Sequence, residues 1–86
     1  MSSNWKTKLN FALEENGESF IDVISNTMSE EEMLVKFDYG YGETGGIPFT
    51  VWTHKHVYFP ICYDGSEWVG CASRFPDGKP TDHQGG

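Results

Sequence analysis

Long apolar runs, basic residues and cysteine are all scarce in this chain of 86 residues. The longest apolar runs are only a few residues, so no membrane-spanning helix is predicted, and the N-terminal MSSNWKTKLN lacks the apolar core of a signal peptide. A cytoplasmic location is therefore expected. Six Lys and Arg against 13 Asp and Glu leave a net charge of −7, which argues against direct binding to nucleic acid or to an anionic membrane.

The two cysteines, Cys62 and Cys71, flank a strong hairpin signal. Asp64-Gly65 between alternating apolar residues is typical of a two-residue turn. This turn predicts four facing pairs: Tyr63 with Ser66, Cys62 with Glu67, Pro60 with Val69, and Tyr58 with Cys71. The thiols then lie four residues apart on one face, roughly 13 Å at strand rise, whereas a disulfide needs Cα atoms within about 7 Å. We therefore expect two free thiols.

The N-terminal part has the spacing of helices. Trp5, Leu9, Ala12 and Leu13 follow an i, i+4, i+7, i+8 pattern, which predicts a helix that begins after a capping residue at Ser2, Ser3 or Asn4 and ends at Gly17. The next segment, Glu18 to Thr27, is rich in β-branched residues, so that helix and strand are hard to separate. A short helix is our preferred interpretation of it.

A capping box marks a further helix. Ser29 and Glu32 have the spacing at which each side chain bonds the other's backbone amide, and acids in the first turn suit the helix dipole. The pattern predicts a helix from Glu30 to about Phe37. Its inward residues are expected to be Met33, Leu34 and Phe37.

After Pro48 the spacing changes from helical to alternating. Three antiparallel strands are predicted, joined by His54-Lys55 and Asp64-Gly65: Phe49–Thr53, His56–Tyr63 and Ser66–Ser73. The fold class is thus α+β, with N-terminal helices packed on a C-terminal three-stranded β-meander. A chain of this size forms a single domain. Its parts are an acidic helical half (1–38), a Gly-rich hinge (39–47), the meander (48–74) and a tail (75–86).

The hairpin register divides the meander into two faces. We assign one face to the core against the helices, and it carries Val57, Phe59, Ile61, Trp68 and Ala72. The other face carries Tyr58, Pro60, Cys62, Val69 and Cys71, and it is more apolar than a solvated face should be. The outer face is therefore an alternative interface, represented by Tyr58, Pro60 and Val69.

The stretch YGYGETGGIP contains the string G-x-G-x-x-G, which in dinucleotide-binding proteins joins a strand to a helix. The predicted order here is the reverse, because a helix precedes Gly40 and a strand follows Pro48. Glu43 would also repel a phosphate. We interpret the glycines as a hinge that lets the backbone turn from the helices to the sheet, and no cofactor is expected.

Acidic residues are concentrated in the first half of the chain. Residues 14 to 43 hold nine acids and one base, Lys36, a local net charge of −8. A field of one sign attracts partners of the opposite sign. These nine acids are our candidate partner-binding residues: Glu14, Glu15, Glu18, Asp22, Glu30, Glu31, Glu32, Asp38 and Glu43. The alternative is that the acids only keep a small protein in solution.

Other chemistry has less support. His54, His56, Cys62 and Cys71 match no familiar zinc spacing, so no metal is expected. The same histidines and His83 are potential bases, but the chain has no nucleophile elbow and no P-loop. We therefore expect a protein that is not an enzyme.

The block FTVWTHKHVYFPICYDGSEWVGCASRFP and the trailing TDHQGG resemble a set of small bacterial and phage proteins with such a meander after an acidic helical segment. Size, acidity and the lack of a catalytic motif make the chain look like the phage-encoded inhibitors called anti-CRISPR proteins. That resemblance implies a DNA mimic in the bacterial host cytoplasm that blocks a basic, nucleic-acid-binding surface of a CRISPR effector. The alternative is a small homodimeric or adaptor protein that binds through its apolar outer sheet face. In either case a monomer or weak homodimer is expected.

Overall fold

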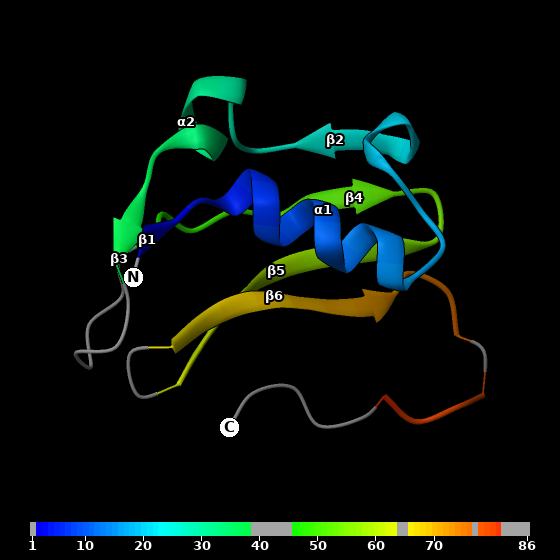
Figure 1. Cartoon of the computed structure of the whole chain (residues 1–86). Coiled ribbons are helices and arrows are strands. Elements are labelled where there is room, and N and C mark those ends of the chain that lie inside the picture. Colours follow the sequence, from blue (N-terminus) through cyan, green and yellow to red (C-terminus); the bar gives the residue numbers. More distant parts are fainter. Residues whose placement is uncertain (1, 39–45, 64–65, 77, 82–86) are drawn as a thin grey trace.

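One helix crosses one face of an antiparallel sheet in this α+β fold (Figure 1). The computed structural model describes residues 2–38, 46–63, 66–76 and 78–81. The helical elements are α1 (Trp5–Glu15), the 3-10 turn η1 (Phe20–Asp22) and α2 (Glu30–Leu34). The main sheet has the order β2-β4-β5-β6, formed by β2 (Val23–Asn26), β4 (Val51–Thr53), β5 (His56–Tyr63) and β6 (Ser66–Ser73). Two short strands, β1 (Ser2–Ser3) and β3 (Phe37–Asp38), pair separately.

Helix α1 follows the predicted pattern. The Asn4 side chain accepts a hydrogen bond from the Thr7 amide at 2.8 Å, which caps the first turn. Gly17, with φ of 73°, takes the left-handed conformation just beyond the helix end. The four predicted inward residues are all buried: Trp5, Leu9, Ala12 and Leu13. The helix prediction is confirmed.

The segment from Glu18 to Thr27 is not a helix, and that prediction was wrong. After the single turn η1 it forms strand β2, which pairs antiparallel with β4. The β-branched residues Val23 and Ile24 fit an extended backbone, and the open edge of β4 supplies the hydrogen-bond partners that decide between the two states. The sheet therefore has four strands rather than three, and the N-terminal half contributes one of them.

Helix α2 has the predicted start but ends early. Ser29 Oγ accepts from the Glu32 amide at 3.1 Å, and the Glu32 carboxylate accepts from the Ser29 amide at 2.8 Å, so the capping box is confirmed. Val35 already has an extended backbone, and the chain continues into β3. A helix of five residues has room for one inward position, which Met33 takes. Leu34 is 49% exposed, so its predicted burial was wrong, and Phe37 lies in a strand.

The hairpin of β5 and β6 has the predicted register. All four predicted pairs occur, from Tyr63 opposite Ser66 to Tyr58 opposite Cys71. The two cysteines are free, as the register requires. Alternation around Asp64-Gly65 therefore fixed the pairing of these strands correctly.

The two faces of the sheet are assigned the wrong way round by the sequence argument. Tyr58 is fully buried, and Val69 and Cys71 pack against the buried core beneath α1. The face predicted as core points away from α1 instead. Both faces carry similar numbers of apolar side chains, so alternation gave the period of the strands but not which face the helix covers.

The end of the Gly-rich segment is held by a close approach to α1. A Cβ on Gly46 would lie 2.6 Å from the Trp5 ring, and the Gly46 amide donates to the buried Glu67 carboxylate at 3.1 Å. Trp5 Nε1 donates to the Ile47 carbonyl at 2.9 Å. Strand β4 follows, so no helix begins here as a dinucleotide site requires. The other hinge glycines, residues 40, 42 and 45, lie outside the described residues.

Candidate partner-binding surfaces

The exposed acids of the helices form two groups. Glu14 and Glu15 lie at the C-terminal end of α1, and α2 carries Glu30, Glu31 and Glu32. Lys6 in the first turn of α1 pairs with Glu30, so α2 lies beside the N-terminal end of α1 (Figure 1). The two groups are therefore separated by most of the length of α1, about 14 Å at helical rise.

Several of these acids also stabilise local structure. Glu30 pairs with Lys6, Glu32 closes the capping box of α2, and the Asp22 carboxylate accepts from the Ser19 amide at 2.9 Å at the start of η1. By contrast, Glu15 on α1 and Glu31 on α2 are exposed and have no part in a helix cap. A substitution that tests partner binding is thus cleanest at the acids with no capping role.

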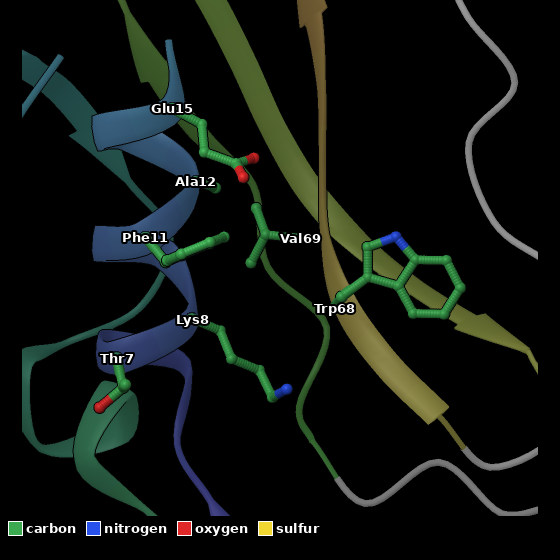
Figure 2. Close-up of a pocket in the computed structure, with 7 residues that line it drawn as sticks. All are labelled: Thr7, Lys8, Phe11, Ala12, Glu15, Trp68 and Val69. Carbon is green, nitrogen blue, oxygen red and sulfur yellow. The ribbon is translucent and has the colours of Figure 1, made fainter. Parts of the chain in front are cut away.

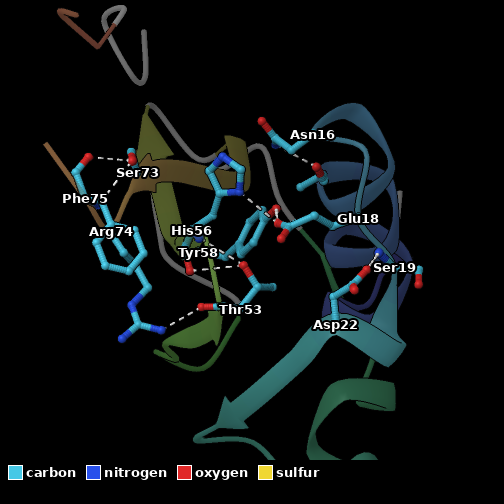
Figure 3. A network of polar contacts seen from close by, with 11 residues as sticks. Asn16, Glu18, Ser19, Asp22, Thr53, His56, Tyr58, Ser73, Arg74 and Phe75 are labelled. Atoms are coloured by element: carbon cyan, nitrogen blue, oxygen red, sulfur yellow. Dashed lines mark hydrogen bonds and ion pairs between the residues drawn. The ribbon is translucent and has the colours of Figure 1, made fainter. Parts of the chain in front are cut away.

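Glu18 does not belong to the acidic surface, although the sequence argument placed it there. Its side chain is only 8% exposed, and its carboxylate accepts hydrogen bonds from the Tyr58 hydroxyl and from His56 Nδ1, the latter at 2.9 Å (Figure 3). Of the other predicted acids, Asp38 is in β3, and Glu43 lies outside the described residues. The structure therefore brings six of the nine acids to the exposed part of the helical layer: Glu14, Glu15, Asp22, Glu30, Glu31 and Glu32.

The Glu18 carboxylate joins the loop after α1 to the middle of the sheet. Burial alone would raise its pKa, but hydrogen bonds from Tyr58, Thr53 and His56 outweigh burial and hold the pKa below its usual value. Burial and the adjacent carboxylate in turn raise the pKa of Tyr58. The Glu18 partners His56 and Tyr58 are 38 and 40 residues away in the chain. No local sequence signal could have revealed this network.

A polar pocket of about 340 Å³ lies next to this network. His56 and Cys71 line it together with Glu15, Asn16 and Ser73. Burial raises the pKa of the Cys71 thiol, so at neutral pH the thiol stays protonated and is a poor nucleophile. The His56–Glu18 pair links the loop after α1 to strand β5.

The sheet face opposite α1 is apolar. The register of β4, β5 and β6 places Trp52, Val57, Phe59, Ile61 and Trp68 on it, all half-buried. A Cβ on Gly70 would lie 2.4 Å from Ile61 Cδ1 and 2.8 Å from Phe59 Cε1, so these two side chains close over the glycine. We call these five residues the uncovered apolar face. It replaces the alternative interface predicted from the sequence, because Tyr58 is fully buried and Pro60 and Val69 lie on the side of α1.

A groove runs between α1 and β6. It has a volume of about 440 Å³ and is lined from the helix by Thr7, Lys8, Phe11, Ala12 and Glu15 (Figure 2). Val69 of β6 lines its other wall, while the ring of Trp68 lies on the opposite side of that strand (Figure 2). Phe11 is 64% exposed. The groove therefore presents an apolar centre at the edge of the sheet.

Over residues 2–38, 46–63, 66–76 and 78–81, no group of three or more His, Cys, Asp or Glu is arranged to hold a metal ion. Within the same part of the chain, every helix is too short or too polar to cross a membrane.

The chain matches no protein-family model, no curated protein and no solved structure.

Proposed function

We propose that this protein is a non-enzymatic inhibitor whose acidic helical surface binds a basic, nucleic-acid-binding surface of another protein, such as a CRISPR effector, in the bacterial cytoplasm. The observation that carries this proposal is the exposure of the acids of α1 and α2, in a stretch where nine acids are accompanied by one base. Only Glu30 among these exposed acids is neutralised by an ion pair in the part of the chain that the structure describes.

The arrangement of the acids suits such a partner. DNA presents about one negative charge per 1.7 Å of helix axis, and proteins that bind it line up Lys and Arg to match. The two acidic groups, one on α2 and the other at the C-terminal end of α1, lie about 14 Å apart along α1, a distance of about four base pairs. The protein therefore offers negative charge to more than one part of a basic groove, and the attraction speeds encounter with the partner.

The proposal is tested by capturing partners from a bacterial lysate with tagged protein at low and high salt. Glu14→Lys/Glu31→Lys changes two exposed acids without removing the caps of α2 or η1. A matched control is Asp77→Lys/Asp82→Lys, outside the described residues, since both double variants change the net charge from −7 to −3. We expect the wild type and the control to recover a nucleic-acid-binding complex that high salt releases. The Glu14/Glu31 variant should lose it at least about tenfold.

Equal recovery by both double variants would contradict the acidic-surface proposal. A partner that stays bound at high salt would contradict it as well, because exposed charge pairs are screened under those conditions.

A second candidate function is favoured by the uncovered apolar face. Contiguous apolar surface of this kind marks protein–protein interaction sites, and aromatic residues such as Trp52 and Phe59 are the side chains that dominate binding energy there. On this alternative the protein is an adaptor, and acidity only keeps it in solution. Phe59→Asp should then abolish a salt-insensitive interaction, whereas Glu14→Lys/Glu31→Lys should leave that interaction unchanged.

A further inference from the structure

The polar pocket of about 340 Å³ lies where the C-terminal end of α1 meets one end of the β5–β6 hairpin. Its polar lining includes residues from four separate stretches of the chain: Glu15 and Asn16 at the end of α1, His56 at the start of β5, Ser73 at the end of β6, and Thr81 beyond it. His56 and Ser73 face each other in the hairpin register. The pocket is therefore a concave site that only the folded chain assembles.

Three polar groups of this pocket are left as hydrogen-bond acceptors by their other contacts. Asn16 donates through Nδ2 to the Ala12 carbonyl at 2.9 Å, which fixes the amide and leaves its Oδ1 for a ligand. His56 Nδ1 lies 2.9 Å from the Glu18 carboxylate, which when ionised can only accept, so the proton is on Nδ1. Nε2 of the neutral ring is then an acceptor, and it faces away from Glu18 (Figure 3). The third group is the Glu15 carboxylate, which forms no ion pair in the described part of the chain.

The end of α1 makes the potential at this pocket more negative. A helix C-terminus carries a partial negative charge and favours cations in its last turn. The last turn of α1 holds Glu14 and Glu15 and no basic residue, so the chain itself does not supply that cation. Ala12 and Val69 add an apolar wall beside the acceptors. A ligand that fits has a positively charged head with several N–H donors and an aliphatic stem.

We propose that this pocket binds the guanidinium group of an arginine side chain. A guanidinium has five N–H donors in a planar fork and no acceptor, which matches a lining of acceptors on separate elements: the Glu15 carboxylate, Asn16 Oδ1 and His56 Nε2. The aliphatic stem lies along Ala12 and Val69. The source of the arginine rests on the function proposed above: the basic surface of the partner supplies it, and the pocket anchors that surface at the end of α1.

A titration of the purified full chain with N-acetyl-arginine amide, followed by NMR at low salt, tests the pocket. The amide signals of Asn16, Cys71 and Thr81 should shift with a dissociation constant of about 1–10 mM. The lysine analogue, of equal charge, should bind at least about threefold more weakly, and the uncharged citrulline analogue at least about tenfold. Glu15→Gln should weaken binding of the arginine analogue about tenfold. Glu14→Gln, the same charge change outside the pocket lining, is the control and should weaken it less than about twofold.

Equal affinities for the three analogues, or equal losses in Glu15→Gln and Glu14→Gln, would overturn the guanidinium site. The source of the arginine is tested on a captured partner complex, which an excess of the arginine analogue should release more effectively than the lysine analogue at the same concentration. Equal release by both would overturn the partner's arginine as the occupant. The titration needs only pure protein, so a pocket that binds no arginine analogue leaves the acidic-surface proposal standing, and a failed partner capture leaves the measured pocket affinity standing.

Discussion

The two faces of the main sheet are made by the same strands, yet they carry out different tasks. On the face toward α1, large side chains are buried and the polar groups among them are paired: Thr53 and Glu67 are buried, and no buried side-chain polar atom in the described part of the chain lacks a partner. On the uncovered apolar face, no helix of the described ranges covers the aromatic residues, which shield each other only in part. An apolar face is thus not sufficient to define a core, because the helix must also fit the face and satisfy its polar groups.

The two faces of the sheet should differ most in the free energy of unfolding that is lost when one tryptophan on each face is replaced by alanine. Trp5 is 1% exposed, stacks edge-on against Phe49 with ring centroids 4.9 Å apart, and donates to a backbone carbonyl. Trp5→Ala should therefore reduce the free energy of unfolding by about 3–5 kcal/mol. Trp68→Ala, on the half-buried side, should lower it by about 1 kcal/mol. Urea denaturation followed by circular dichroism measures both, and equal losses would remove the distinction between the faces.

Replacing one glycine by alanine on each face of the sheet gives a second comparison of stability losses. In Gly46→Ala the new Cβ meets the rigid, buried Trp5 ring at 2.6 Å, so we expect a loss of about 1–3 kcal/mol in the free energy of unfolding. In Gly70→Ala it meets the ends of the Ile61 and Phe59 side chains on the uncovered face, which can turn toward solvent. That loss should stay below about 1 kcal/mol. Thermal melts of the two variants measure both losses. A larger loss of stability for Gly70→Ala than for Gly46→Ala would contradict the prediction.

The buried carboxylate of Glu18 predicts that the free energy of unfolding depends on pH. Because the pKa of Glu18 is lowered in the folded state, its contribution to stability is fully present above its ordinary pKa of 4.5 and is lost as the pH falls through the lower folded value. Glu18→Gln should reduce the free energy of unfolding at pH 7 by about 1–3 kcal/mol and flatten the acid limb of the stability curve. Glu15→Gln, on the exposed part of α1, is the control. A Glu18→Gln curve parallel to that of wild type would rule out this role.

The smallest expected effect on stability is that of the acidic surface. Glu14→Lys/Glu31→Lys should change the free energy of unfolding by no more than about 0.5 kcal/mol, because both residues are exposed and the hydrogen bond that the Asn10 side chain donates to Glu14 lies on the helix surface. Melting temperatures of the variant and of wild type at the same ionic strength check this. A large loss would mean that these acids hold the fold together, and a binding defect of the variant would then carry no information about a partner.

Local signals in the sequence predicted more of the fold than of its surfaces. The apolar spacing of α1, the capping box of α2 and the register of the β5–β6 hairpin were each predicted from neighbouring residues, and each was correct. The strand β2 was missed because its β-branched residues suit either state until an open sheet edge is present. The Glu18 network joins residues 38 and 40 positions apart, and the covered face depends on contacts between α1 and β6, which lie further apart still in the sequence. Alternation and charge counts contain no information on such contacts.

The central claim, that the acidic surface takes the place of nucleic acid on a basic partner, is tested most directly by competition. Once a partner complex is captured, a short DNA or RNA duplex is added in increasing amounts, with wild-type protein and with the Asp77→Lys/Asp82→Lys control immobilised in parallel. The account predicts that nucleic acid releases the partner from both, and that protein and nucleic acid never occupy the partner together. A stable complex that contains the partner, the nucleic acid and this protein at once would contradict it.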